Sequence, residues 1–344
     1  MKRFSLYLAL VGGLLGGLAA NRLYDRCLSP EAAFFRRAAE YSDQWAQQMR
    51  QGGQPLIVWA GGSELRAGID PEALWKSYGI RSVNAAGQAG FGMPANYALA
   101  LPYLQKGDTL IVAGLGLDEV FASGAKFAWE RAGMQMFESG LLPRNADTLR
   151  KIFLGNSGEF CMHLSKRLVH PLQPPYKYET ASVLHPGGWM EVQASEMQGS
   201  PVPTFGRLDG VNLPPLPESY VQLMRSIKAY TEARGVKLAC MLPVEYRHSN
   251  DRPVRAHMVL ELLDMGIPVL RDPRFGAEPR VDYFADTGNH LNAAGVAEQT
   301  RLLGAALTGE AWWKREDVAA YLRLRGWDEH GRWIRRSSYT PFSW

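Results

Sequence analysis

Short apolar runs alternate with helix-like segments along most of this chain, and this alternation limits the folds it can adopt. Residues 56–60 form a continuous apolar run, and residues 109–115 and 236–242 are largely apolar and of strand length. Such runs are typical of strands buried on both faces, as in a parallel sheet. The alternation of strands with helices predicts an α/β fold, a three-layer α/β/α sandwich around a parallel sheet.

The other elements are predicted from local signals. Helices are expected over residues 30–50, 71–78, 94–105, 217–234, 254–265 and 292–307, and short strands over 81–84 and 267–270. The first helix has a clear start, because Ser29 can cap it and Pro30 suits its first turn. It should end at Gly52-Gly53, and either act as a stalk or pack against the edge of the domain.

The chain begins with a stretch that resembles a membrane segment. Residues 4–20 are uncharged and largely apolar, and Lys2 and Arg3 precede them. A stretch of about 17 residues is at the lower limit for a membrane span, and the two cations favour a cytoplasmic N-terminus. We therefore expect an uncleaved, single-pass inner-membrane anchor over residues 1–26, a linking helix within 27–54, and a periplasmic domain. A cleaved signal peptide is the alternative, because Ala19 and Ala20 suit a cleavage site.

Two regions depart from the alternating pattern. Residues 119–214 are rich in proline and aromatics, and so long an aperiodic segment inside a domain of residues 55–310 is usually functional or flexible. We expect an inserted cap beside the functional site; a peripheral elaboration is the alternative. Residues 311–344 form a tail that either grips carbohydrate, a partner or a membrane, or packs on the domain. Its five tryptophans are Trp312, Trp313, Trp327, Trp333 and Trp344.

Charge and cysteine content argue against two classes of protein. The formal net charge of +4 is small for 344 residues, and no basic run carries interleaved aromatics, so we expect no nucleic-acid partner. No Cys/His cluster has zinc-site spacing, so we expect no metal, and we expect no other cofactor. The three cysteines are Cys27, Cys161 and Cys240, an odd number that leaves one unpaired within a single chain. Cys161 and Cys240 are a possible pair.

Two short segments carry the residue types of nucleophilic catalysis. Residues 61–65 (Gly-Gly-Ser-Glu-Leu) follow the first strand, and residues 286–292 (Asp-Thr-Gly-Asn-His-Leu-Asn) lie late in the chain. A serine needs a base to remove its proton, and that base needs an acid to orient it. The segments therefore predict Ser63 as nucleophile, His290 as base and Asp286 as the orienting acid.

Each of these residues also has a simpler interpretation. Ser63 could cap the following helix, and His290 could be an exposed residue at the start of the helix at Asn292. That capping role is more natural for Asn292 itself. Asp282 is the alternative to Asp286 as the orienting acid.

The two segments resemble the motifs of the SGNH (GDSL-like) hydrolase superfamily. The closer resemblance is to its membrane-anchored branch in envelope-polymer pathways, the DltD-like and alginate-acetylation-like proteins, in which the nucleophile motif reads Gly-Ser-Ser or Gly-Gly-Ser. Residues 61–65 fit that motif, and Asp286 with His290-Leu291-Asn292 and Gly295 is similar to the final motif. The resemblance covers roughly residues 55–118 and 215–308.

The chain departs from the superfamily pattern in two places. Asp286 and His290 are four residues apart, whereas the usual spacing is three, so their loop must bulge by one residue. The Gly-x-Asn-Asp motif, which supplies an oxyanion-hole asparagine, has no clear counterpart.

An acyl-transfer site also needs preorganised donors for the developing oxyanion. The first motif offers Gly62 and the Ser63 amide. The superfamily's second glycine motif would fall at residues 84–90, where Gly87 and the Gln88 side chain are the candidate donors. Asn84 there is equally consistent with a turn residue. Residues 245–247 (Glu-Tyr-Arg) end a strand, and either line the pocket or form a solvated loop.

The resemblance implies an extracytoplasmic serine O-acetyltransferase or carbohydrate esterase. Its substrate would be a cell-surface polysaccharide or related envelope polymer, and acetyl the transferred group. A membrane-bound acyltransferase or a polysaccharide synthase complex would be its partner. Hydrolysis and transfer use the same triad, so both stay open. The alternative is a non-catalytic SGNH-like scaffold subunit of an envelope polysaccharide synthesis or export complex.

Overall fold

The computed structural model describes residues 11–13, 16, 30–88, 93–113, 182–193, 208, 210–309 and 311–334. Most of the expected membrane segment and of the expected cap lies outside these residues, as do Cys27, Cys161 and Trp344. Within the described ranges, no helix is both long and apolar enough to cross a membrane.

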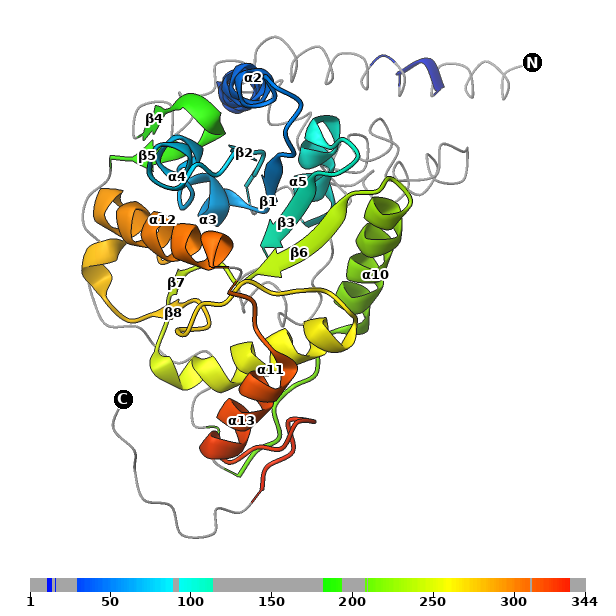
Figure 1. Ribbon diagram of the computed structural model, residues 1–344, viewed down its shortest axis with the longest axis vertical. Helices are drawn as coiled ribbons and strands as arrows, with labels where there is room; N and C mark the ends of the chain where they lie inside the picture. The colour runs from blue at the N-terminus through cyan, green and yellow to red at the C-terminus, as the bar shows by residue number, and fades with distance from the viewer. Residues whose placement is uncertain are drawn as a thin grey trace.

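A four-stranded parallel sheet lies at the centre of the fold, in the order β2-β1-β3-β6 (Figure 1). Its strands are β1 (Ile57–Ala60), β2 (Ser82–Asn84), β3 (Thr109–Ala113) and β6 (Lys237–Met241). Val58 of β1 pairs with Val83 of β2 and with Leu110 of β3, and Val112 of β3 pairs with Cys240 of β6. The predicted α/β fold with a parallel sheet is therefore confirmed.

Helices cover both faces of the sheet. Successive strand residues point to opposite sides, so each strand contributes apolar side chains to both faces. On one face Val58, Val112 and Cys240 pack in a cluster with α2 (Pro30–Met49), α5 (Met93–Ala100), α10 (Glu218–Glu232) and α11 (Arg252–Asp264). On the other face the neighbouring residues Trp59, Ile111 and Ala239 pack against α3 (Ser63–Arg66), α4 (Pro71–Tyr78) and α12 (Ala293–Thr308).

The first long helix, α2, belongs to the domain and is not a free stalk. The Ser42 hydroxyl donates to the Asn84 carbonyl oxygen at 2.9 Å, and the Trp45 indole donates to the Ser82 carbonyl oxygen at 2.8 Å. Both acceptors belong to β2, one of the two edge strands of the sheet. Of the two predicted roles, packing against the domain edge is the one observed.

The strand expected over residues 267–270 is reduced to isolated bridges. Val269 bridges Cys240 and Leu270 bridges Trp312. Pro268 has no N–H to donate, although its carbonyl accepts from the Cys240 amide at 2.8 Å. A proline in so short a run prevents a regular fifth strand at this edge.

The residues after α12 pack on the domain. Helix α13 (Arg315–Arg325) buries Val318 and Leu322 against the cluster that contains α11. The Trp313 ring stacks on Phe275 with centroids 4.6 Å apart, and Trp327 is buried beside Trp333. These tryptophans therefore pack the tail onto the domain.

The cysteine in β6 is not part of a disulfide. Cys240 is fully buried and its thiol is free, so the possible pairing with Cys161 is not made. Burial raises the pKa of this thiol far above its usual range, because the thiolate would lose its solvation.

Candidate active site

Ser63 lies where an α/β sheet commonly places a functional residue. Along the chain, β1 is followed by β2 on one side of it and then by β3 on the other, so the connections reverse direction at β1. Ligands of such sheets bind at the carboxyl ends of the strands beside this reversal. Ser63 is three residues beyond the end of β1 and is half-buried.

The two glycines before Ser63 allow the chain to turn tightly at this point. A Cβ atom at Gly61 would lie 2.7 Å from Leu65 Cδ1 and 3.1 Å from Ala113 Cβ, so a side chain there would disturb the packing. Gly62 is the capping residue of α3 and makes no side-chain cap bond; Ser63 is the first residue of the helix. The simpler interpretation of Ser63 as a capping serine is therefore wrong.

Asp286 and His290 face each other across a tight loop. His290 Nδ1 lies 2.7 Å from Asp286 Oδ1, and the two side chains are 5% and 9% exposed. The loop closes because Phe284 bridges Leu291 and the Ala285 amide donates to the His290 carbonyl oxygen at 2.8 Å. The turn at its tip accommodates the four-residue spacing.

The neighbouring residues exclude the alternatives for this loop. Asn292 caps α12, since its Oδ1 accepts from the Gly295 amide at 3.0 Å, and His290 is buried. The Asp282 side chain is exposed. The backbone carbonyl oxygen of Asp282 accepts from Asn292 Nδ2 at 2.6 Å. Asp286, and not Asp282, is therefore the carboxylate that pairs with His290.

The loop with the Asp–His pair packs against the turn that follows Ser63. The Ala67 amide closes that turn by donating to the Ser63 carbonyl oxygen at 2.8 Å, and Ala67 shares a buried cluster with Ala285. A Cβ atom at Gly68 would lie 3.7 Å from Leu291 Cδ1. Among the described residues, no hydrogen bond joins the Ser63 hydroxyl to His290. Such bonds are often long or poorly aligned in enzymes without substrate.

A hairpin from the expected cap region lies beside these segments. It consists of β4 (Ser182–Leu184) and β5 (Met190–Val192), joined through a turn at Pro186–Gly188. Met190 and Val192 pack in the same cluster as Ala67 and Ala285. This part of the 119–214 segment therefore contacts both halves of the candidate site.

Three of the predicted oxyanion donors have other partners. The Gly87 amide donates to the Gly61 carbonyl oxygen at 2.9 Å, and the Gly62 amide donates to Glu64 Oε1 at 2.8 Å. Asn84 is fully buried, and its Nδ2 donates to the carbonyl oxygens of Leu65 at 2.8 Å and Ile69 at 3.1 Å. Asn84 is thus not an oxyanion donor. Its Oδ1 accepts from the Ala86 amide at 3.1 Å, as in an Asx turn, so the turn interpretation holds. Its Nδ2 ties the end of β2 to the segment around α3.

One donor from the prediction, the Ser63 amide, is not committed in this way. The Ser63 amide occupies the first position of α3, where a helix has no intrahelical acceptor. Gln88 is half-buried, and its carbonyl oxygen accepts from Asn96 Nδ2 at 3.0 Å.

The sequence pattern did not indicate Arg66 as a positioning residue. Its buried guanidinium donates to the carbonyl oxygens of Ala86 and, at 2.8 Å, Gly188. It therefore ties the Ser63 helix to the end of β2 and to the hairpin turn. An arginine three residues after the serine was the available signal, but arginines are mostly exposed, so burial was not expected.

Residues 245–247 are part of the support for the site and not a solvated loop. Glu245 and Tyr246 form β7 (Glu245–Tyr246) beside β8 (Ala277–Glu278), and both are buried. The Tyr246 amide donates to the Gly288 carbonyl oxygen at 2.6 Å, which holds the Asp–His loop. Glu245 pairs with the buried Arg255.

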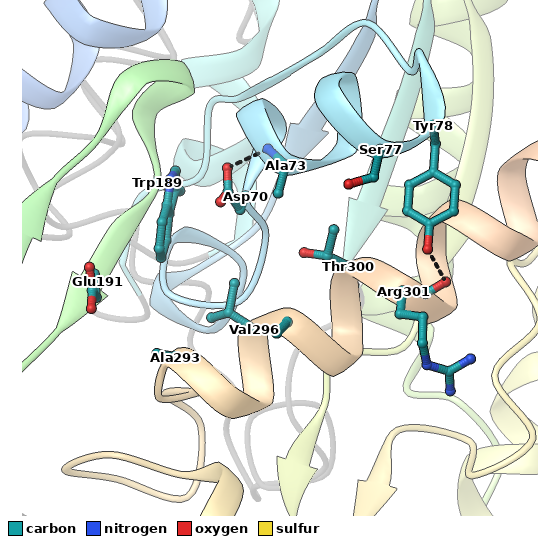
Figure 2. Close-up of a pocket in the computed structure, with 11 residues that line it drawn as sticks. Asp70, Ala73, Ser77, Tyr78, Trp189, Glu191, Ala293, Val296, Thr300 and Arg301 are labelled. Atoms are coloured by element: carbon teal, nitrogen blue, oxygen red, sulfur yellow. Dashed lines mark hydrogen bonds between the residues drawn. The ribbon is translucent and has the colours of Figure 1, made fainter.

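A groove of ≈ 310 Å³ lies near these residues but does not contain them. It runs between α4 and α12 (Figure 2), and neither Ser63 nor His290 lines it. In the described part of the chain, no group of three or more His, Cys, Asp or Glu side chains could hold a metal ion.

Comparisons with protein-family models, with curated proteins and with solved structures found no match to this chain. Its function is therefore inferred from its residues and their geometry.

Proposed function

We propose that this chain is an SGNH-like serine O-acyltransferase or esterase with Ser63, His290 and Asp286 as its triad. The observation that carries the proposal is the 2.7 Å contact between His290 Nδ1 and Asp286 Oδ1 in a shielded loop. That loop packs against the turn following Ser63, at the carboxyl end of β1. A carboxylate that orients a shielded imidazole is the arrangement that general-base catalysis by histidine uses.

The reaction would proceed in two steps. Asp286 accepts a hydrogen bond from Nδ1–H of His290 and keeps that proton on Nδ1, so that the unprotonated Nε2 can take the Ser63 proton. Ser63 Oγ then attacks the ester carbonyl, and the tetrahedral intermediate expels its alcohol, which takes the proton from His290. Water or a sugar hydroxyl next attacks the acyl-enzyme, with His290 again as base, and Ser63 regains its proton. The Ser63 amide is the oxyanion donor that α3 leaves uncommitted.

The substrate and location in this proposal rest on the resemblance of residues 61–65 and 286–292 to the envelope-polymer branch. The substrate is a cell-surface polysaccharide or related envelope polymer, which carries the acetyl ester if the enzyme is an esterase and accepts the acetyl group if it is a transferase. The enzyme acts in the periplasm, tethered to the inner membrane by residues 1–26, beside a membrane-bound acyltransferase or polysaccharide synthase complex.

One observation favours a second candidate, the non-catalytic scaffold. The Gly62 and Gly87 amides both have partners, so fewer donors face a developing oxyanion than an acyl-transfer site usually has. In that role the chain would hold other subunits of the same envelope complex and would turn over no ester.

Hydrolysis of p-nitrophenyl acetate separates the two candidates. Ser63→Ala should lower kcat by at least about four orders of magnitude, because the nucleophile is lost. Ser226→Ala is the matched control: this serine is exposed on α10, and its hydroxyl donates to the Gln222 carbonyl oxygen. Equal turnover in the two variants would remove Ser63 from the mechanism, and no turnover by the unaltered protein would favour the scaffold.

A further inference from the structure

The groove between α4 and α12 has the form of a small binding site. Figure 2 shows the two helices on either side of it, with Trp189 and Glu191 at one end and Tyr78 and Arg301 at the other. Its volume of ≈ 310 Å³ lies at the lower end of the range for small-molecule sites, about 300–1,000 Å³.

Thr300 places an unused hydroxyl in this groove. Its Oγ1 is buried and has no hydrogen-bond partner among the described residues, and in Figure 2 it points between α4 and α12. A threonine inside a helix commonly bonds back to the carbonyl four residues earlier. Thr231 and Thr308 of this chain do so, at 3.0 Å and 2.8 Å. A buried hydroxyl without a partner is costly, and a bound ligand would remove that cost.

A second buried donor lies at the end of the groove formed by Trp189. Its Nε1 also has no partner among the described residues, and the side chain is only 7% exposed. The ring stacks on His185 with centroids 4.4 Å apart, and it packs in the cluster that contains Val296 of α12. The indole is therefore held rigidly, with its buried N–H left without a partner among the described residues.

Asp70 supplies an acceptor. Its Oδ1 caps α4 by accepting from the Glu72 and Ala73 amides at 2.9 Å and 3.0 Å, and no residue that the structure describes donates to Oδ2. Burial raises the pKa of this carboxyl, although the two amide bonds and the nearby His185 oppose the shift. The groove therefore offers hydrogen-bond acceptors and donors close to one another.

The charges around the groove favour a neutral ligand. Glu191 bonds to His185 at 2.9 Å, and Arg301 pairs with Glu298 at 2.8 Å, so neither charge is left over for a ligand. An anion would be repelled by the carboxylate of Asp70, which lines the groove. A metal ion would lack a third carboxylate or imidazole ligand among the described residues.

We propose that this groove binds one neutral sugar residue. Its hydroxyls would donate to Asp70 Oδ2 and accept from Trp189 Nε1 and Thr300 Oγ1. Its C–H face would lie against Val296 and the Tyr78 ring, which also line the groove. Ala293, which lines the groove, is three residues after His290 in the sequence. The bound sugar would therefore belong to the polymer that reaches Ser63. The assignment of the sugar as part of the acyl-bearing or acyl-accepting polymer rests on the proposed function.

The test is methyl-detected NMR of the full chain, titrated separately with glucose, galactose, mannose and N-acetylglucosamine. A single-sugar site is expected to have a Kd on the order of 1 mM, so each sugar is taken well above that concentration. At least one sugar should shift the methyl signals of Thr300, Val296 and Ala73. Thr300→Val should weaken that binding about tenfold without lowering Tm, because it removes a hydroxyl that has no structural partner. Thr308→Val, with its hydroxyl bonded within the same helix, is the matched control.

A second variant tests the charge argument. Asp70→Asn retains a good capping residue and should weaken binding of the same sugar about tenfold. Glucuronate should bind the unaltered protein at least about tenfold more weakly than glucose, and Asp70→Asn should narrow that gap.

Three results would overturn the inference: no sugar moves the groove methyls, Thr300→Val and Thr308→Val weaken binding equally, or glucuronate binds best. Binding is read without turnover, and Ser63→Ala should retain it. Sugar binding without esterase activity would therefore contradict the proposed function alone, and esterase activity without sugar binding would contradict the groove alone.

Discussion

At the residue scale, the pair formed by His290 and Asp286 is the most specific feature of the site. A carboxylate that holds an imidazole in one tautomer makes the imidazole a more efficient base. Replacing the carboxylate by an amide of the same shape should keep the imidazole in place. Asp286→Asn should therefore leave the fold intact and lower kcat by about four orders of magnitude. Steady-state ester hydrolysis measures this, with the exposed Asp282→Asn as control. Equal activity of the two variants would place Asp286 outside the mechanism.

Asn84 is a different kind of residue, because its role is structural. Removing its side chain by Asn84→Ala leaves the carbonyl oxygen of Ile69 without its side-chain donor and the Ala86 amide without its acceptor. The carbonyl oxygen of Leu65 loses one of its donors. The free energy of unfolding should fall by about 2–3 kcal/mol, measured by urea denaturation. Asn250→Ala, at an exposed site, should change it by less than about 0.5 kcal/mol. A similar loss in both variants would mean that the Asn84 bonds contribute little.

The sequence predicted residue types better than residue partners. Ser63, Asp286 and His290 were recognised because a strand end, a glycine pair and a spaced Asp–His motif are local signals. The roles of Asn84, Gly87 and Arg66 depend on contacts with distant backbone atoms, which no local pattern contains.

At the element scale, the β7–β8 pair carries an ionic network that should make stability depend on pH. Glu278 of β8 is buried, which by itself would raise its pKa, but bonds from Arg280 and Arg274 lower the pKa to about 2. Because the folded pKa lies below the unfolded value of 4.5, this carboxylate stabilises the fold above pH 4.5. The stabilisation is lost as the pH falls from 4.5 to about 2.

The prediction for this element concerns Glu278→Gln. In urea denaturation, the fall in unfolding free energy between pH 7 and pH 3 should be smaller in the variant by about 2 kcal/mol. Glu232→Gln, which removes an exposed partner of Lys228, should leave the pH dependence as it was. An unchanged pH dependence in Glu278→Gln would show that the network gives no net stabilisation.

Elements with strong local signals were predicted well. The helix over residues 71–78 is observed as α4 (Pro71–Tyr78), with Asp70 as its cap, and the three long apolar runs are the strands β1, β3 and β6. The strand at 267–270 failed because of Pro268. Residues 245–247 were expected to end a strand, and Glu245 and Tyr246 form the separate two-residue strand β7. Its partner β8 was not predicted, since so short an element has no periodicity to detect.

At the scale of the whole molecule, the order of the strands and the packing of α12 bring the two segments of the candidate site together. The reversal at β1 places Ser63 at the carboxyl ends of the strands, and α12 packs on the face covered by α3 and α4. The loop before α12 therefore lies beside the turn after Ser63. Alternating strands and helices predicted this layering, but the strand order depends on tertiary packing and was not predictable from the pattern.

A whole-molecule prediction concerns location. If residues 4–20 are an anchor with a cytoplasmic start, the domain lies beyond the membrane. Alkaline phosphatase fused after Trp344 should be active, protease should degrade the domain in spheroplasts, and a salt wash should not release the protein. A domain protected from protease in spheroplasts would contradict the periplasmic location. A shortened soluble form would indicate a cleaved signal instead.

The central claim is that His290 activates Ser63, and covalent labelling with a fluorophosphonate tests it most directly. Mass spectrometry of the labelled protein should find one adduct, on the peptide that contains Ser63. Ser63→Ala should abolish it, and His290→Gln should slow labelling by about three orders of magnitude, because the base is lost. Ser226→Ala should label as the unaltered protein does. A folded protein that gains no adduct at Ser63, or one that labels equally fast with His290→Gln, would contradict the account.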